Sequence, residues 1–314
     1  MKLKIANLHI EITGDLNPLF IERVTPYQDS FFKADISIHF RLQEHVELPK
    51  DYQLITVTND RTWATLPDGT FCYWDFNEQI GKHTLLTKIR QDKIDISFYH
   101  FQDEEEIRLI NEALREYKKT MPNPKEYKNA QNAAFKPEFP LINSTDQAMR
   151  YALLSHNGFM VHASAIVYDG QGILFSAPSG TGKTTHTKLW EAAYESSFIL
   201  NDDSPIIRFM EDGKAYACGS PWAGASGEGR NVMVPLKAIV FLQQGEKNEI
   251  SRLQTIQALQ WLLGSVNRPV EKGLMDKLFT LIHLLLSDTP CYLLKCRPDR
   301  DAVETVKNEL FCND

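Results

Sequence analysis

The strongest indication of fold in this 314-residue chain is the stretch Phe175-Ser-Ala-Pro-Ser-Gly-Thr-Gly-Lys-Thr-Thr185. An apolar run ends there in a glycine-rich turn, after which a lysine and two hydroxyl residues open a helical pattern over residues 184–194. Strand, glycine-rich turn and helix, in this order, are the context that a nucleotide-phosphate loop requires. The sequence therefore predicts a protein of the α/β (α+β) class that binds phosphate at this turn.

The residue types in the turn suit the chemistry of a triphosphate. Backbone N–H groups would surround phosphate oxygens, Lys183 would reach the β- and γ-phosphates, and the Thr184 hydroxyl would ligate Mg²⁺. The usual pattern begins with a glycine where this chain has Ala177, but the later glycines make the close approach. The predicted nucleotide-binding residues are Ser179, Gly180, Thr181, Gly182, Lys183, Thr184 and Thr185.

An acidic pair, Asp202-Asp203, closes a short apolar run that Pro205 then interrupts. This pattern predicts a strand with carboxylates at its tip. Ligands of open α/β sheets lie beyond the carboxyl ends of strands, so we expect Lys183 and both acids around one pocket. Strand-end acids are often only turn formers. Beside the lysine loop, we expect one of the two acids to ligate the metal and the other to act as the base.

Two apolar runs separated by Asp169-Gly-Gln-Gly172 predict a β-hairpin that leads into the loop. The strand before the loop is thus expected to be antiparallel to its predecessor, unlike that of a common P-loop NTPase. With Ser179–Thr185, Asn201-Asp-Asp203 and an upstream His162, residues 160–209 resemble the HPr kinase/phosphorylase and ATP-dependent phosphoenolpyruvate carboxykinase group.

That resemblance implies a mixed-sheet nucleotide-binding domain with ATP and Mg²⁺ as cofactors. The resemblance assigns the general base to Asp203, which leaves Asp202 as the metal ligand beside Thr184. It also assigns the electrophilic lysine to Lys183, and a residue that orients the γ-phosphate or the acceptor to His162. A histidine at this place is also commonly a hydrogen-bonded strand residue. HPr kinases have Ser-Glu after the lysine, where this chain has Thr184-Thr185. The acceptor is therefore left open as a hydroxyl of a protein, a peptide or a small molecule.

Two other functions fit parts of the sequence. The Ser-Gly-Thr-Gly-Lys-Thr-Thr run also suggests a carboxykinase acting on oxaloacetate, but the chain is shorter than those enzymes and lacks their further arginine and metal-ligand motifs. The alternative from another class is a nucleotide-binding sensor, in which the N-terminal sheet docks a partner and catalysis is slow or absent.

A second glycine-rich stretch, Ala217–Asn231, follows the acidic strand. Its four glycines would let the backbone approach a ligand closely, and Arg230 would offer a guanidinium to phosphate or carboxylate. The competing interpretation is a surface connection with a solvated arginine.

The chain is predicted to form two domains. Residues 1–121 form a mostly antiparallel β-rich domain with a closing helix, residues 122–140 a proline-punctuated linker, and residues 141–314 the nucleotide-binding domain, which opens on a capping box at Ser144–Gln147. Alternating apolar residues predict N-terminal strands at 3–12, 36–42, 53–57, 62–66, 71–76, 84–89 and 93–99.

Composition restricts the partners. A net charge of −7 argues against nucleic acid and against anionic membrane surfaces. No run of eighteen apolar residues and no signal-peptide pattern occurs, so we expect a cytoplasmic protein with five reduced cysteines. The helices expected at 255–266 and 273–286 carry apolar faces for the core or for a homo-oligomer surface.

Overall fold

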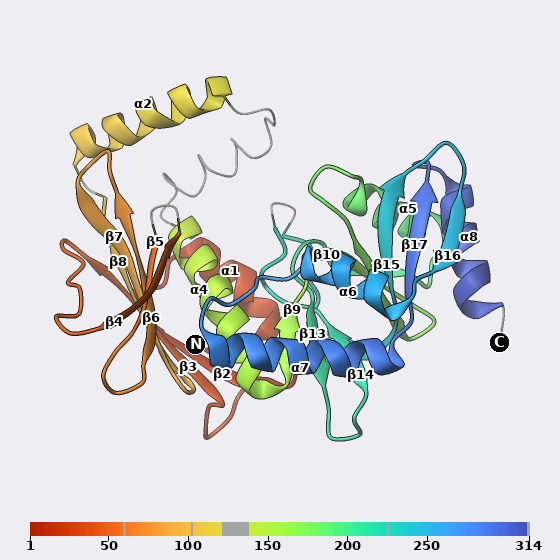
Figure 1. Cartoon of the computed structure of the whole chain (residues 1–314), viewed down its shortest axis with the longest axis horizontal. Coiled ribbons are helices and arrows are strands. Elements are labelled where there is room, and N and C mark those ends of the chain that lie inside the picture. The colour runs from red at the N-terminus through yellow and green to blue at the C-terminus, as the bar shows by residue number, and fades with distance from the viewer. Residues whose placement is uncertain (59–60, 102, 121–137, 225–226, 313–314) are drawn as a thin grey trace. The chain divides into compact units, whose positions relative to one another are not determined.

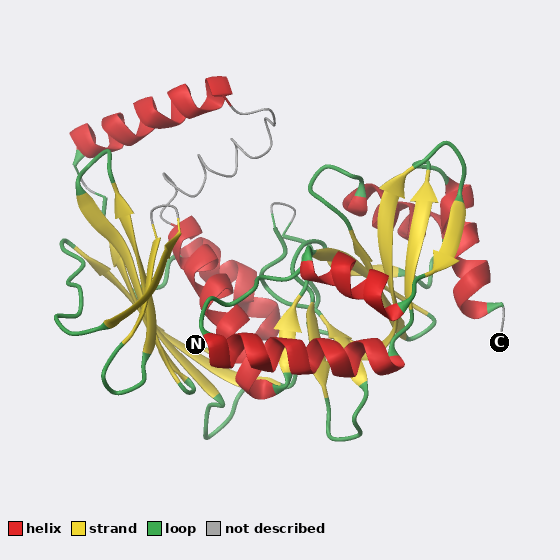
Figure 2. Ribbon diagram, in the orientation of Figure 1, coloured by secondary structure: helices red, strands yellow, loops and turns green. Residues whose placement is uncertain are grey.

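The computed structural model describes residues 1–58, 61–101, 103–120, 138–224 and 227–312 (Figure 1). The chain folds into two compact units. One contains Met1–Leu3 and Leu8–Ala152, and the other contains Lys4–Asn7 and Leu153–Asp314. Each unit holds most of one β-sheet, so the protein is a mixed α/β protein with two mixed sheets (Figure 2).

The N-terminal sheet contains, among the described residues, eight strands in the order β1-β2-β3-β8-β7-β6-β5-β4. From β4 to β8 the strands form an antiparallel meander, whereas β3 lies parallel to both β2 and β8. The strands are β1 (Lys2–Ile5), β2 (Leu8–Gly14), β3 (Ile36–Gln43), β4 (Gln53–Thr58), β5 (Arg61–Thr65), β6 (Phe71–Asn77), β7 (Lys82–Arg90) and β8 (Lys93–Tyr99). The strands predicted here from alternating apolar residues are confirmed, except that the run predicted over 3–12 forms two strands, because Ala6 and Asn7 turn the chain with positive φ.

The helices of the first unit are α1 (Pro18–Val24), α2 (Glu104–Thr120) and α4 (Glu138–Ala152), with a 3₁₀ turn η1 (Thr25–Tyr27). Helix α4 packs on α1 and on β3, β7 and β8, so the compact units divide after Ala152 rather than near residue 140. The predicted linker falls mostly on residues 121–137, which lie outside the described residues, and it stays a prediction.

The capping box predicted at Ser144 does not begin a helix, because α4 already starts at Glu138. Thr145 lies inside the helix, where its hydroxyl donates to the carbonyl of Leu141 at 2.7 Å. Such a bond to the preceding turn satisfies a hydroxyl in the middle of a helix. Pro140, in the first turn, does not interrupt it, because the first N–H groups have no intrahelical acceptor.

The second sheet has nine strands within the described residues, in the order β12-β10-β11-β15-β14-β13-β9, and β17 joins β15 to β16. The strands are β9 (Gly158–Met160), β10 (Ala163–Tyr168), β11 (Gln171–Ser176), β12 (Phe198–Asn201), β13 (Ile206–Phe209), β14 (Ala215–Cys218), β15 (Met233–Gln244), β16 (Glu249–Arg252) and β17 (Cys291–Cys296). The predicted hairpin is confirmed: β10 and β11 pair antiparallel around a turn with positive φ at Asp169 and Gly170.

Strand directions bring the important loops to one edge of this sheet. Strand β10 is antiparallel to both neighbours, β11 and β12. The start of β10 therefore lies between the ends of β11 and β12. Strand β15 runs parallel to β11, and β17 runs parallel to β15. The carboxyl ends of β11, β12, β15 and β17 consequently share one edge.

Helices cover both faces of the second sheet. They are α5 (Lys183–Ala193), α6 (Thr255–Leu263), α7 (Lys272–Asp288) and α8 (Arg300–Phe311), with the 3₁₀ turn η2 (Leu153–His156). Successive residues of β11 point to opposite faces, so Phe175 packs with Trp190 and Val303 of α5 and α8. Leu174 packs on the other face with Leu262 and Leu281 of α6 and α7. A sheet buried on both faces explains the continuous apolar runs in these strands.

Two further expectations concern the chain as a whole. None of the described helices is long and apolar enough to cross a membrane. All five cysteines are free thiols, and burial raises the pKa of the Cys218 and Cys291 thiols to about 12, so these two stay protonated.

Candidate functional site

The site is built on the shared edge of the second sheet, where the chain passes between the two halves of that sheet. His162 stands between β9 and β10, and Asp202 and Asp203 stand between β12 and β13. Backbone bonds fix these crossings to one another: the Ala163 N–H donates to the Asp203 carbonyl at 3.1 Å, and the Val161 N–H donates to that of Pro205 at 3.1 Å. The histidine and the acids are thus held side by side by main chain.

The glycine-rich turn between β11 and α5 has the backbone that its sequence requires. Gly180 has φ +81° and Gly182, the N-cap of α5, has φ +115°, conformations that residues with a Cβ rarely adopt. A Cβ added at either glycine would meet no atom within 4 Å. The glycines are therefore needed for conformation, and the space above the turn is open. First-turn N–H groups of α5 point out of the helix start.

Lys183, the first residue of α5, is buried, with 8% of its surface exposed. Its Nζ donates to the Ala177 carbonyl at 2.9 Å and lies 3.0 Å from Nε2 of His162. Ala177 itself is 5% exposed and belongs to the apolar cluster under α5. The residue that replaces the usual first glycine therefore packs in the core and helps to hold the lysine.

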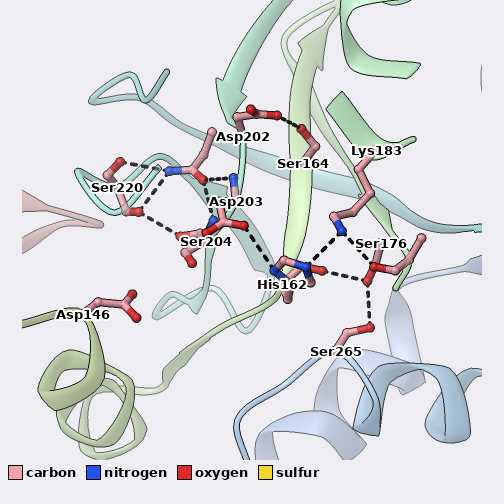
Figure 3. A network of polar contacts seen from close by, with 12 residues as sticks. Asp146, His162, Ser164, Ser176, Lys183, Asp202, Asp203, Ser204, Ser220 and Ser265 are labelled. Carbon is pink, nitrogen blue, oxygen red and sulfur yellow. Dashed lines mark hydrogen bonds and ion pairs between the residues drawn. The ribbon is translucent and has the colours of Figure 1, made fainter. Parts of the chain in front are cut away.

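His162 joins the lysine to the second acid. Its Nδ1 lies 3.2 Å from Oδ1 of Asp203, and the two side chains are 43% and 39% exposed. An ammonium group has only donors, so Nε2 of His162 accepts from Lys183 and the ring proton is on Nδ1, facing the carboxylate. Figure 3 shows the resulting chain from Lys183 through His162 to Asp203. All three predicted catalytic residues are in contact.

Asp202 points to a different partner. Its Oδ1 accepts from the Ser164 hydroxyl at 2.6 Å (Figure 3), and that hydroxyl lies 3.2 Å from the hydroxyl of Thr187 in α5. Thr184 precedes Thr187 by one helical turn, so this chain of contacts brings the predicted metal ligands Asp202 and Thr184 to the same region. No group of three or more His, Cys, Asp or Glu side chains that could hold a metal occurs among the described residues.

A carboxylate and a threonine hydroxyl fit Mg²⁺, which commonly takes one or two protein oxygens and completes its shell with phosphate and water. The Ser164 hydrogen bond orients Asp202 through Oδ1, and within the described part of the chain no side chain occupies its second oxygen. The donor set therefore suits a magnesium ion that arrives with a phosphate group.

The sequence did not reveal what orients Asp203. The buried Asn201 accepts at Oδ1 from the N–H groups of Asp203 and Ser204, at 2.9 and 2.7 Å, and donates through Nδ2 to Ser220. Gly224 approaches the other side: a Cβ there would lie 2.9 Å from Cβ of Asp203. The second glycine-rich stretch thus reaches the predicted base. The sequence feature that could have indicated this role is an asparagine at the end of an apolar strand, directly before the two acids.

A second unpredicted group is a set of serines beneath His162. The Ser176 hydroxyl donates to the His162 carbonyl at 2.9 Å and lies 2.7 Å from the Ser265 hydroxyl. The Ser265 carbonyl accepts from the His162 N–H at 2.7 Å. Ser176 and Ser164 occur inside apolar strands, and a hydroxyl in such a run is the sequence signal that could have identified them.

Arg230 lies apart from these contacts. Its guanidinium is 4.6 Å from the ring centroid of Phe198, which begins β12, whereas Asp202 follows the other end of that strand. The structure therefore does not bring Arg230 together with His162, Lys183 and Asp203. Its role as a phosphate or substrate ligand stays a prediction.

Comparison with known proteins places the chain in a family. The family model described as "ScmC: SynChlorMet cassette protein ScmC" matches residues 141–298, slightly more than half of the chain. The chain belongs to this family. No curated protein matches it. A solved structure described as the Hpr(Ser) kinase/phosphatase from Coxiella burnetii is similar at 14% identity and a TM-score of 0.28, covering 48% of this chain and 95% of that one. A TM-score this low supports no conclusion about fold or activity.

Proposed function

We propose that this member of the ScmC family is an ATP- and Mg²⁺-dependent phosphotransferase that moves the γ-phosphoryl group to a hydroxyl acceptor, on a nucleotide-binding fold of the HPr kinase/phosphoenolpyruvate carboxykinase type. The observation that carries the proposal is the chain of contacts from Lys183 through His162 to Asp203, at the mouth of a glycine-rich turn with an open space above it. A cation for phosphate and a carboxylate for a hydroxyl proton are the two groups that such a transfer needs.

In the proposed reaction Asp203 accepts the proton of the acceptor hydroxyl. The acceptor oxygen forms a bond to the γ-phosphorus while the bond from that phosphorus to the β,γ-bridging oxygen breaks, which yields ADP and a phosphate ester. His162 holds Asp203 through its Nδ1 proton, and Asn201 holds the Asp203 main chain. Most of the rate acceleration would come from this positioning and from charge stabilisation.

Lys183 would stabilise the negative charge that grows on the transferring group. Its ammonium lies against the Ala177 carbonyl and His162, and it would exchange the histidine contact for a phosphate oxygen. Asp202 and Thr184 would hold Mg²⁺, which when bound would neutralise charge on the phosphates. Ser164 keeps Asp202 in place for that role.

The test follows phosphate from radiolabelled ATP into candidate acceptors and into water. Wild-type protein is compared with Lys183→Ala, and Lys188→Ala serves as the matched control, because Lys188 is an exposed lysine of the same helix α5. We expect Lys183→Ala to lower transfer about 10³-fold, as loss of a charge-stabilising donor does, and Lys188→Ala to leave it within about twofold, as for an exposed site without such a role.

Transfer that survives Lys183→Ala unchanged would reject this assignment. Tight binding of ATP with neither transfer nor hydrolysis would instead favour the nucleotide-binding sensor. Formation of phosphoenolpyruvate from oxaloacetate and ATP would favour a carboxykinase.

A further inference from the structure

A cavity of about 490 Å³ lies on the far side of the glycine-rich turn from His162 and Asp203. One wall is the turn itself, through Gly180 and Gly182, together with Thr185 of α5. The opposite wall comes from the ends of β15 and β17, through Gln243, Gln244 and the segment that follows Cys296. Ligand pockets commonly enclose about 300–1,000 Å³, so the cavity is large enough for a small organic group.

The strand order separates this cavity from the catalytic residues. In the sequence β12-β10-β11-β15, the strands that carry His162 and the acids lie on one side of β11, and β15 and β17 lie on the other. Figure 1 shows β15 and β17 as neighbours. A phosphate chain on the turn would therefore have its reacting end toward β10 and β12 and its other end toward the cavity.

The lining of the cavity carries little free charge. Arg297 forms an ion pair with Asp299 at 2.9 Å, Gln243 and Gln244 carry neutral amides, and burial raises the pKa of the Cys296 thiol. A neutral lining with hydrogen-bonding amides favours an uncharged polar group over a phosphate.

One histidine on α5 supplies a donor of fixed direction. His186 lines the cavity and is 3% exposed. Its Nε2 accepts from the indole N–H of Trp190 at 3.3 Å, which places the ring proton on Nδ1. The Nδ1–H group has no hydrogen-bond partner among the described residues. Its nitrogen is also absent from the described polar atoms that are both shielded from solvent and unpartnered.

We infer that this cavity binds the nucleoside of the nucleotide whose phosphates lie on the glycine-rich turn, and that the Nδ1–H of His186 donates to an acceptor atom of that nucleoside. The inference rests on the proposed function, because it requires phosphates on the turn. It adds a recognition site that is separate from the residues of phosphoryl transfer.

The experiment compares two ligands that share three phosphates and differ in the nucleoside. Binding of ATP and of inorganic tripolyphosphate, each with Mg²⁺, is measured by calorimetry on the full chain. Tripolyphosphate carries more negative charge than ATP, so any advantage of ATP comes from its nucleoside. We expect wild-type protein to bind ATP at least about tenfold more tightly, a difference of one or two hydrogen bonds and some apolar contact.

Two variants remove that advantage in different ways. Gln244→Trp fills the cavity from its exposed rim, and His186→Phe keeps the ring volume but removes the donor. Both are expected to weaken ATP binding about tenfold and to leave tripolyphosphate binding within about twofold. Gln260→Trp, at an exposed glutamine of α6, is the matched control and should change neither. Retained tripolyphosphate binding also demonstrates that a variant is folded.

Equal affinity of wild-type protein for the two ligands would overturn the inference while leaving the phosphate site intact. The inference would also be overturned if Gln244→Trp bound ATP with wild-type affinity, or if it lost affinity for ATP and for tripolyphosphate equally. Failure of wild-type protein to bind either ligand would reject the proposed function, and this inference with it.

Discussion

The two sides of strand β11 differ in the solvent exposure and in the charge of the side chains that would meet a ligand. On the side of β10 and β12, His162 contacts both Lys183 and Asp203, and His162 and Asp203 are about two-fifths exposed. On the side of β15 and β17, another histidine, His186 of α5, lines a cavity, and its ring is buried and neutral. The same edge of one sheet thus carries a charged chain of contacts and a neutral hollow.

This difference indicates that the two sides of the phosphate loop have different functions, phosphoryl transfer on one side and ligand recognition on the other. A base such as Asp203 must be reached by the acceptor, and Asp203 and His162 accordingly lie at the exposed side. Groups that recognise a shape need fixed protonation states, which burial provides by penalising the charged form. The loop between them would hold the phosphates that connect the two tasks.

The largest expected effect tests the charged side. Asp203→Asn keeps the shape of the side chain but removes the proposed base, so transfer to the acceptor should fall about 10²- to 10⁴-fold, while ATP affinity stays within about twofold. Steady-state transfer and calorimetry measure the two quantities. Asp288→Asn, at an exposed aspartate that ends α7, is the control. A fall in affinity equal to the fall in rate would show that Asp203 binds nucleotide instead.

The next effect tests the neutral side through pH. Burial depresses the pKa of His186 from 6.5 to about 4, and the groups packed on its ring, Phe175 and Trp190, do not titrate. The unfolded chain therefore takes up this proton first as pH falls. The stability that the neutral ring provides is complete above pH 6.5 and is lost between pH 6.5 and about 4, a change of about 3 kcal/mol.

Urea unfolding at pH 7 and at pH 4.5 measures this loss as a difference between the wild type and His186→Phe. The variant should lose less unfolding free energy over this interval, by about 2 to 3 kcal/mol, whatever its stability at pH 7. His283→Gln, at an exposed histidine of α7, should behave as the wild type does. Equal losses in the wild type and His186→Phe would contradict a neutral buried ring.

A smaller effect concerns the support of the charged side. Asn201→Ala removes the acceptor of the Asp203 and Ser204 N–H groups and the donor to Ser220, which should lower the unfolding free energy by about 1 to 3 kcal/mol. The rate of transfer at saturating ATP should also fall about tenfold, because Asp203 loses its fixed direction. Asn201→Asp keeps the acceptor oxygens, so it should restore part of the rate. A stability loss without a rate change would make Asn201 purely structural.

The smallest expected effect tests whether Arg230 belongs to the charged side. The guanidinium of Arg230 lies over Phe198 at the far end of β12, where an exposed cation–π contact contributes about 0.5 to 1 kcal/mol. Arg230→Ala should therefore change transfer and ATP affinity by less than about twofold and lower stability by that small amount. A loss of transfer above tenfold would place Arg230 in the site, as its sequence position first suggested.

Much of the fold could be predicted from the sequence because its signals are local. Strict alternation identifies the strands of the N-terminal sheet, and the Asp169-Gly170 turn identifies the hairpin before the phosphate loop. Local signals also misled. The hydroxyl residues at Ser144 and Thr145 suggested a helix start, but Thr145 bonds within its own helix, and a sequence cannot show which carbonyl a hydroxyl will choose.

Helix α1 was not predicted, although Asn17 caps it and Pro18 begins it. The helix is seven residues long and buries two of them, Phe20 and Val24. About two helical turns with so few apolar contacts have no periodicity to detect, and packing rather than propensity stabilises the helix.

The residue types already show which positions could bind phosphate and which could take a proton, because Gly180, Gly182, Lys183 and the acidic pair have chemistry and backbone freedom that few other residues offer. The folded structure was needed to show that Asn201 and Ser164 orient the two acids, that the Arg230 side chain lies over Phe198, and that His186 lines a cavity. These outcomes depend on strand order and on burial. Both arise from contacts between residues far apart in the chain, which no local pattern records.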